Sequence, residues 1–155
     1  MTIRRATTVE DGHALIALIR RLAEFEHLTG PDDAAAERFI EDGFVRNPAC
    51  YEAYLIDDSD AQAAGYLLFF QTYSTFLCRP SLYIEDLFVL PEHRGKGYGK
   101  QLLTLCLDLA RERGCGRVEW AVLDWNTSAQ AFYQSIGAHH LTEWQLYRTL
   151  VECDL

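Results

Sequence analysis

Apolar residues run almost without interruption from Leu82 to Leu90, and the exceptions are two adjacent acids, Glu85 and Asp86. A short continuous apolar run bounded by turn signals is typical of a buried strand. Pro91 follows directly, and because proline has no backbone N–H to donate to a ladder, the strand is predicted to end there.

The next apolar pattern has helical spacing and begins after a basic loop. Its stripe consists of Leu102, Cys106, Leu109 and Ala110, and the predicted helix runs to Arg113, with Gly114 as the stop signal. The loop consists of Arg94, Gly95, Lys96, Gly97, Tyr98, Gly99 and Lys100. A glycine loop that opens a helix places unpaired backbone N–H groups at the positive end of the helix dipole, which favours phosphate. The alternative is a tight turn with a solvated basic face.

The rest of the chain alternates between helical and strand patterns. Further strands are predicted at Ile3-Arg4, Tyr51–Ile56, Ala64–Thr72, Arg117–Leu123 and Trp144–Leu150, and further helices from Glu10 to Glu26, from Asp32 or Asp33 to Phe44, and over Ser128–Ile136. Tyr73–Pro80 is expected to be a connection. This order predicts an α/β protein with a mixed sheet, in which the long crossover between strands 82–90 and 117–123 gives a parallel pair and the other connections are hairpin-like.

Composition narrows the class of protein. With 155 residues, 49% of them hydrophobic, the chain is expected to form a single domain. It shows no signal peptide and no apolar run of the ~20 residues that a membrane span needs. The cysteines are odd in number and form no C-x-x-C, which favours reduced thiols in the cytoplasm; they are Cys50, Cys78, Cys106, Cys115 and Cys153. The histidines lack zinc-ligand spacing, so no metal is expected.

The net charge of −9 argues against a nucleic-acid partner, because such proteins normally present a basic face. It is compatible with a cationic small-molecule substrate, although many acidic proteins owe their charge to solubility alone.

The glycine loop fits neither of two common phosphate motifs. A P-loop would need glycine where Arg94 stands and Ser or Thr where Gln101 stands, and the dinucleotide fingerprint would need glycine at Lys100. The pattern Arg-x-x-Gly-x-Gly over 94–99 instead resembles the coenzyme A pyrophosphate loop of the GNAT superfamily of N-acetyltransferases.

Two further segments extend this resemblance. Tyr83–Val89 before the loop, and Trp125-Asn126, Phe132-Tyr133 and Gly137-Ala138 after it, are similar to the diamine (spermidine/spermine) N-acetyltransferase branch. The resemblance implies the GNAT fold: a mostly antiparallel central sheet with one splayed parallel pair and helices on both faces. It also implies acetyl-CoA as the donor and a homodimer.

Two kinds of ionisable group are candidates for the chemistry. Glu85 and Asp86 are expected to face opposite sides of the sheet, and a carboxylate among apolar neighbours should have a raised pKa, which suits a general base. Residue chemistry alone leaves open that both acids cap backbone or pair with a buried arginine; the resemblance implies that Glu85 is the base. Tyr133, with a phenol pKa near ~10, matches the family's general acid, although an aromatic core residue fits the pattern too.

The resemblance also implies binding roles. The pantetheine arm would pair with backbone at Leu87, Phe88 and Val89, where an N–H would polarise the thioester, and with Asn126, Ser128 and Ala129. The amine would be held by Phe25, Glu26, Glu85, Asp86, Glu143 and Trp144, since acids and aromatics suit a cationic chain. The sequence therefore predicts an acetyl-CoA-dependent N-acetyltransferase for a diamine or polyamine. The alternatives are a lysine-like or thialysine acceptor, and a non-catalytic CoA-binding module.

Overall fold

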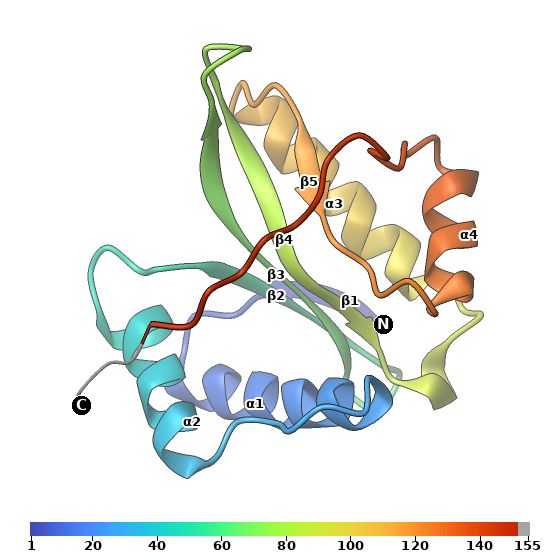
Figure 1. The fold of residues 1–155 in the computed structure, drawn as a ribbon. Helices are drawn as coiled ribbons and strands as arrows, with labels where there is room; N and C mark the ends of the chain where they lie inside the picture. Colours follow the sequence, from blue (N-terminus) through green and yellow to red (C-terminus); the bar gives the residue numbers. More distant parts are fainter. Residues whose placement is uncertain (152–155) are drawn as a thin grey trace. The chain divides into compact units, whose positions relative to one another are not determined.

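A five-stranded mixed sheet forms the centre of the first of two units, Met1–Ala121, in this computed structural model, which describes residues 1–151 (Figure 1). The elements of this unit are β1 (Thr2–Arg5), α1 (Val9–Phe25), α2 (Asp33–Ile40), β2 (Glu52–Asp57), β3 (Ala63–Ser74), β4 (Arg79–Val89), α3 (Tyr98–Glu112) and β5 (Val118–Trp120). The second unit begins at Val122 and contains α4 (Thr127–Ser135). That the chain is a single domain stays a prediction.

The strands lie in the order β1-β2-β3-β4-β5, and the first three pairings are antiparallel. β4 and β5 pair in parallel, from Leu82 opposite Val118 to Ile84 opposite Trp120, with α3 as the crossover between them. The predicted mixed sheet with a single parallel pair is therefore confirmed.

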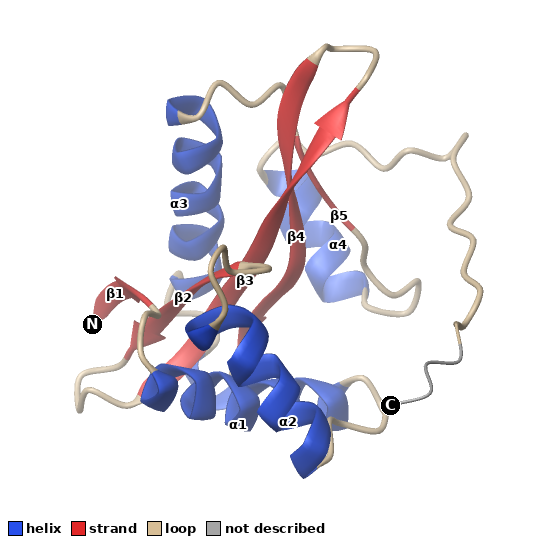
Figure 2. Cartoon of the chain, turned by 90° about the vertical axis from the view of Figure 1, so that its left-hand side faces the viewer, coloured by secondary structure: helices blue, strands red, loops and turns tan. Residues whose placement is uncertain are grey.

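Helices cover both faces of the sheet in the first unit, with α1 and α2 on one face and α3 on the other (Figures 1 and 2). On the α1 face, Leu15 and Leu18 belong to one buried cluster with Tyr66 and Phe88 of the sheet. On the other face α3 buries residues of the predicted stripe, among them Leu102, Cys106 and Ala110. Burial of these stripes is the main favourable contribution to folding.

The β3–β4 hairpin is longer than its apolar pattern indicates. Tyr73 pairs with Pro80 and Ser74 with Arg79, so the prediction that Tyr73–Pro80 is a connection is wrong except for its central residues. The reason is that the apolar pattern stops before the hairpin does: Tyr73 is 63% exposed and Ser74, although buried, is polar, so backbone pairing continues where the apolar pattern ends.

Three other boundaries differ from the pattern. The second helix ends at Ile40 and is followed by a π-helical turn over Glu41–Val45, and β5 covers only the centre of Arg117–Leu123. The predicted last strand, Trp144–Leu150, is irregular chain. Residues with high strand propensity form a strand only where they pack against a neighbouring strand and become buried, and in this segment Trp144 is 73% exposed.

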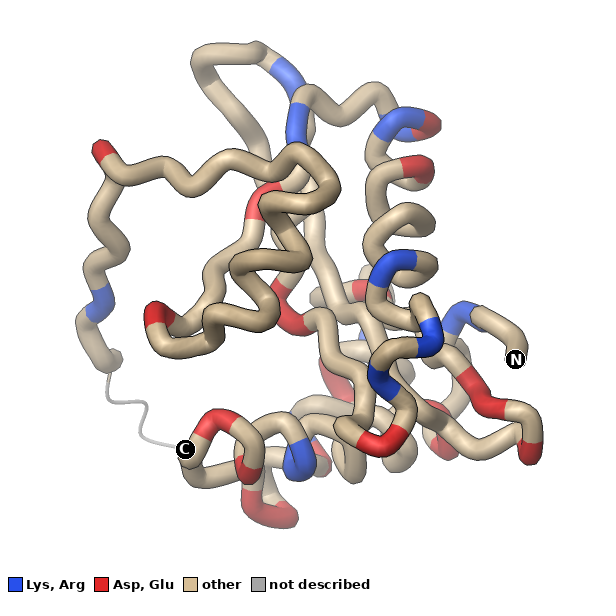
Figure 3. Tube along the Cα trace, turned by 90° about the vertical axis from the view of Figure 1, so that its right-hand side faces the viewer, with Lys and Arg blue, Asp and Glu red and all other residues tan. Residues whose placement is uncertain are grey.

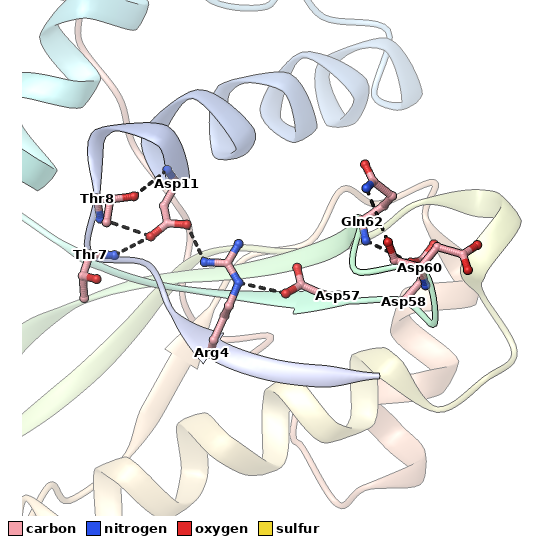
Figure 4. A network of polar contacts seen from close by, with 8 residues as sticks. All are labelled: Arg4, Thr7, Thr8, Asp11, Asp57, Asp58, Asp60 and Gln62. Atoms are coloured by element: carbon pink, nitrogen blue, oxygen red, sulfur yellow. Dashed lines mark hydrogen bonds and ion pairs between the residues drawn. The ribbon is translucent and has the colours of Figure 1, made fainter.

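An ion-pair network joins β1, α1 and β2 (Figure 4), in which the half-exposed side chain of Arg4 pairs with two buried carboxylates. Arg4 donates to Asp11 and, through Nε at 2.8 Å, to Asp57. Asp11 also completes the capping box of α1, since it accepts from the backbone N–H of Thr8 while its own N–H donates to the Thr8 hydroxyl. Burial raises the pKa of Asp11, but the bonds from Arg4 and from two backbone N–H groups outweigh it and lower that pKa to about 2.

Asp11→Ala is expected to lower the free energy of unfolding by about 1–2 kcal/mol, because it removes a helix cap and one of the two carboxylates that pair with the half-exposed Arg4. The ionised Asp11 stabilises the native state above the ordinary carboxyl pKa, and this contribution is lost as the pH falls towards 2. Urea unfolding at pH 7 measures the effect. Asp33→Ala is the control, because Asp33 pairs with Arg20 at an exposed site, where a change within about 0.5 kcal/mol is expected. Equal losses of unfolding free energy in both variants would show that the contacts of Asp11 stabilise the protein no more than an exposed ion pair does.

Candidate active site

A β-bulge in β4 sets the geometry of the two acids. Asp86 lies opposite Leu68 and Ile84 lies opposite Phe69, so Glu85 between them has no opposite residue in β3. A bulge interrupts the alternation of side chains. Glu85 and Asp86 consequently line the same cleft, and the prediction that they face opposite sides of the sheet is wrong.

The cleft has a volume of about 610 Å³ and lies within the first unit. Its walls are apolar side chains of α1, α2 and the sheet, among them Ile16, Ile19, Phe39 and Phe70, and the two acids of β4 are its charged lining residues. An apolar cleft with a few convergent charged groups is the usual form of a small-molecule site.

Asp86 is the half-buried acid of the pair. Its carboxylate accepts a hydrogen bond of 2.9 Å from the hydroxyl of Tyr66, which is fully buried. Burial raises the pKa of Asp86 to about 6; the Tyr66 bond opposes this rise, and the charges of Glu85 and Glu26 add to it. The raised pKa expected of a strand carboxylate is therefore found at Asp86, whereas the Glu85 side chain is exposed. The sequence pattern gives no signal for a role of Tyr66, because its contact with Asp86 depends on the register between β3 and β4.

Phe25 and Glu26, at the end of α1, join this region. The Phe25 ring lies 6.4 Å from the Phe88 ring, centre to centre. Glu26 is half-buried, and its burial raises the pKa of its carboxyl. Since its charge also acts on Asp86 and Tyr66, Glu26, which the resemblance assigns to the acceptor site, lies near the Asp86 carboxyl.

Arg94 connects the glycine loop to the end of α1. Its Nε donates to the carbonyl of Val89 at 3.0 Å, and its guanidinium carbon lies 4.4 Å from the centre of the Phe25 ring. This cation–π contact holds Arg94 against the sequence-predicted acceptor region, while its remaining N–H groups stay available for an anion.

The loop itself has the geometry that a phosphate requires. Gly95 and Gly97 have φ of 75° and 81°, and a Cβ at Gly95 would meet no atom within 4 Å. Gly97 caps α3 without a side-chain bond, so the first N–H groups of the helix lack intrahelical partners. Lys96 and Lys100 are exposed on either side of Gly97. The chain has 23 acidic and 14 basic residues, and the charged residues of the described part are spread along the trace (Figure 3). The loop therefore fits a pyrophosphate.

The free edge of β4 fits an extended ligand. Pairing with β5 ends at Ile84, and no other strand within residues 1–121 pairs with that edge of Leu87–Val89. Exposed backbone groups along such an edge can bind an extended chain as an added strand does.

The remaining candidates belong to the second unit and are described within it. The Asn126 Oδ1 accepts from the backbone N–H of Ala129 at 3.2 Å and caps α4, where Ser128 is exposed. Tyr133 is half-buried on α4, 5.4 Å from the Phe132 ring, and burial raises the pKa of its phenol. Glu143 and Trp144 are exposed in the chain that follows.

Residues 1–151 contain neither a cluster of metal-ligating side chains nor a membrane-spanning helix. No group of three or more His, Cys, Asp or Glu side chains is placed there to hold a metal ion, and no helix there is long and apolar enough to span a membrane. Cys50, Cys78, Cys106 and Cys115 are free thiols, and Cys153 lies outside the described residues.

A model of the Acetyltransferase (GNAT) family matches residues 12–138. The chain belongs to the GNAT acetyltransferase family. It is 35% identical over 155 residues to the thialysine N-epsilon-acetyltransferase of Bos taurus, a match that covers 94% of this chain and 90% of that protein. It is also 46% identical over 98 residues to the L-ornithine N5-acetyltransferase NATA1 of Arabidopsis thaliana, covering 63% of this chain but only 43% of that protein.

Solved structures agree with the GNAT fold. A probable acetyltransferase has a TM-score of 0.82 with 22% identity, covering 99% of this chain and 100% of its own. AAC(6')-Iy, in complex with the bisubstrate analog CoA-S-monomethyl-acetylneamine, has a TM-score of 0.77 with 21% identity, covering 97% of this chain and 98% of its own. These likenesses confirm the predicted fold.

This GNAT protein is therefore an enzyme that transfers an acetyl group to an amine, as the sequence predicts, and not a binding module alone. GNAT acetyltransferases use acetyl-CoA. The roles of the individual site residues stay predictions.

Proposed function

We propose that this GNAT enzyme acetylates a primary amine of a small cationic substrate by direct attack on acetyl-CoA in a ternary complex. The observation that carries the proposal is Asp86: a half-buried carboxylate with a pKa of about 6, fixed by Tyr66 in an apolar cleft immediately before the glycine loop. A carboxylate with a pKa near neutrality suits proton transfer from an amine.

The proposed roles account for each proton. Acetyl-CoA supplies the acetyl thioester, and a C–N bond forms as the C–S bond breaks. Asp86 takes the proton that the amine loses, and Glu85 and Glu26 attract the substrate's positive charge. The Tyr133 hydroxyl, which burial keeps protonated at neutral pH, donates its proton to the departing sulfur. A backbone N–H near Leu87 or Phe88 polarises the thioester carbonyl.

The donor would be held by groups already in place. The loop N–H groups of residues 95–100, with Lys96 and Lys100, would bind the pyrophosphate, and Arg94 would contribute its free N–H groups. The backbone of Leu87–Val89 would pair with the pantetheine arm along the free edge of β4. Asn126, Ser128 and Ala129 at the start of α4 are proposed to bind that arm too, although the Asn126 side chain already caps the helix.

For the acceptor we propose a lysine-like amine, such as thialysine or ornithine, ahead of a polyamine. Relatives 35% and 46% identical are named for these two substrates, whereas the human spermidine/spermine N(1)-acetyltransferase-like protein 1 is 27% identical over 143 residues, which are 20% of its length. A diamine or polyamine remains the second candidate for one reason: the charged residues of the cleft wall, Glu85 and Asp86, are both acidic and offer no cation for an α-carboxylate.

Thiol release from acetyl-CoA with matched amines separates these candidates. Lysine and cadaverine differ only by the α-carboxylate, as do ornithine and putrescine, and thialysine and spermidine extend the two series. A kcat/KM at least tenfold higher for each amino acid than for its decarboxylated partner would support the lysine-like acceptor. The reverse order would establish the diamine. Absence of release with all six amines, despite CoA binding in calorimetry, would contradict the proposed function.

Gly97→Ala is expected to raise the KM for acetyl-CoA about tenfold or more. Its φ of 81° strains any residue with a Cβ, by about 1–2 kcal/mol, and relief of that strain would displace the loop N–H groups. Gly114→Ala is the control, because Gly114 has a φ of 67° at the other end of α3 and equally open surroundings. Both variants should lose similar stability, and only Gly97→Ala should change KM. An unchanged KM in Gly97→Ala would contradict the loop's role.

We further propose that the enzyme is a cytoplasmic homodimer. The free thiols at Cys50, Cys78, Cys106 and Cys115 support a reducing compartment. The homodimer is what the resemblance to the diamine N-acetyltransferase branch implies. Sedimentation equilibrium tests the dimer, and a mass of 17.7 kDa at micromolar concentration would overturn it.

A further inference from the structure

The turn between β2 and β3 lies against the chain that leads into the glycine loop. Asp58, in this turn, places Oδ2 3.7 Å from Nε2 of His93, which ends the 3₁₀ turn Pro91–His93 before the loop. On the other side of the same ring, His93 Nδ1 lies 3.4 Å from Nζ of Lys96. The three side chains thus form a chain of contacts that ends on a loop cation.

Asp58 is held rigidly at the start of this chain. Its Oδ1 accepts from the backbone N–H groups of Asp60, at 2.8 Å, and Gln62, at 3.0 Å. These two bonds are the main reason why the pKa of the Asp58 carboxyl lies below its ordinary value, and the positive charge of Lys96 adds to the effect. The group that faces His93 is therefore a fixed carboxylate.

The chemistry of the two neighbours sets the proton on the ring. A lysine ammonium can only donate, and an ionised carboxylate can only accept. His93 satisfies both when its proton is on Nε2, directed at Asp58, and the Nδ1 lone pair is directed at Lys96. The ring is further fixed by Tyr98, whose ring lies 6.3 Å away, centre to centre, with an interplanar angle of 13°.

We infer that Asp58 and His93 are positioning residues that orient Lys96 for the diphosphate of the donor. The inference rests on the proposed function, in which Lys96 belongs to the donor site. Lys96 lies between Gly95 and Gly97, both with positive φ, so its backbone is in a segment where side-chain direction is weakly constrained. A flexible lysine loses rotamer entropy when it binds an anion, and an acceptor that holds it beforehand reduces that loss.

A double-mutant cycle on CoA binding tests the inference. Asp58→Asn is expected to weaken CoA binding in calorimetry, and to raise the KM for acetyl-CoA, by up to about fivefold, the factor of one lost charged contact near the surface. The kcat and the KM for the amine should stay unchanged. In a Lys96→Met background, Asp58→Asn should have no further effect, because the group that it orients is gone.

Two comparisons with matched variants make the outcome decisive. Asp60→Asn removes the same charge from the same turn while the Asp60 backbone bond remains, so it should leave the CoA affinity within twofold. In His93→Asn the amide oxygen can take the place of Nδ1 and still accept from Lys96, whereas in His93→Gln the amide replaces only Nε2, which faces Asp58. His93→Asn should therefore weaken CoA binding less than His93→Gln.

Additive effects of Asp58→Asn and Lys96→Met, or equal effects of Asp58→Asn and Asp60→Asn, would overturn the inference. Because calorimetry with CoA requires no turnover, this test can succeed or fail independently of whether the protein acetylates an amine.

Discussion

Tyr133→Phe is expected to lower kcat by about 100-fold to 1,000-fold, the usual contribution of a general acid, while CoA affinity stays within about twofold. The substitution keeps the half-buried ring on α4 and removes only the hydroxyl. Burial raises the pKa of this phenol above its ordinary value, so the group stays protonated, and able to donate, throughout the neutral range.

Thiol release at saturating acetyl-CoA, with CoA affinity from calorimetry, measures both quantities. Tyr147→Phe is the matched control, since Tyr147 is 86% exposed and its hydroxyl donates to Gln145. An unchanged kcat in Tyr133→Phe would assign the residue to the packing of α4 alone, which is the alternative that its helical pattern allows. A kcat that recovers with acyl donors whose thiol is more acidic would support proton donation to sulfur.

The fold was largely predictable because the apolar patterns correspond to buried surfaces. The stripe of α3 and the run that forms β4 both lie in the core of the first unit, and Thr8 and Asp32 cap their helices as their positions predict. The predictions that were wrong concern segments where burial does not decide the structure. Tyr73 and Arg79 continue the β3–β4 hairpin although both are exposed, and Trp144 has the composition of a strand without burial.

The sequence predicted which segments contribute to the candidate site, but not how their side chains are arranged. The glycine loop and the Glu85-Asp86 pair are local in sequence, so motif spacing located them. A bulge depends on the register of two strands, and it is this register that brings both acids into one cleft and Tyr66 to Asp86. The contact of Asp58 with His93 likewise joins residues from distant segments. A single sequence carries no local signal for such contacts.

Asp86→Asn is expected to lower kcat/KM about 100-fold and, unusually for a functional loss, to stabilise the fold. Asparagine keeps an oxygen that accepts from Tyr66, but it cannot take a proton from the amine. In the wild type, kcat/KM should fall as the pH drops through about 6, where Asp86 becomes protonated. This acidic limb should be absent in Asp86→Asn. Tyr66→Phe should move the limb to higher pH, because the Tyr66 bond lowers the pKa of Asp86.

The stability effect has the opposite direction for a physical reason. Folding raises the pKa of Asp86 from 3.8 to about 6, so the native state binds its proton more tightly than the unfolded chain does. This stabilisation is complete below pH 3.8 and is lost as the pH rises through 6, above which the buried charge costs about 1–3 kcal/mol. Urea unfolding should therefore show Asp86→Asn to be more stable than the wild type at pH 8 and similar to it at pH 4.

Glu85→Gln is the neighbouring control, because the Glu85 side chain is exposed on the bulge and its charge is solvated. It should leave stability unchanged at both pH values and reduce kcat/KM less than Asp86→Asn does. The opposite ranking, with Glu85→Gln abolishing the acidic limb and Asp86→Asn retaining it, would return the base to Glu85 and leave Asp86 as a support for Tyr66. A stable but inactive Asp86→Asn would instead exclude misfolding as the cause and assign the proton transfer to the half-buried acid of the cleft.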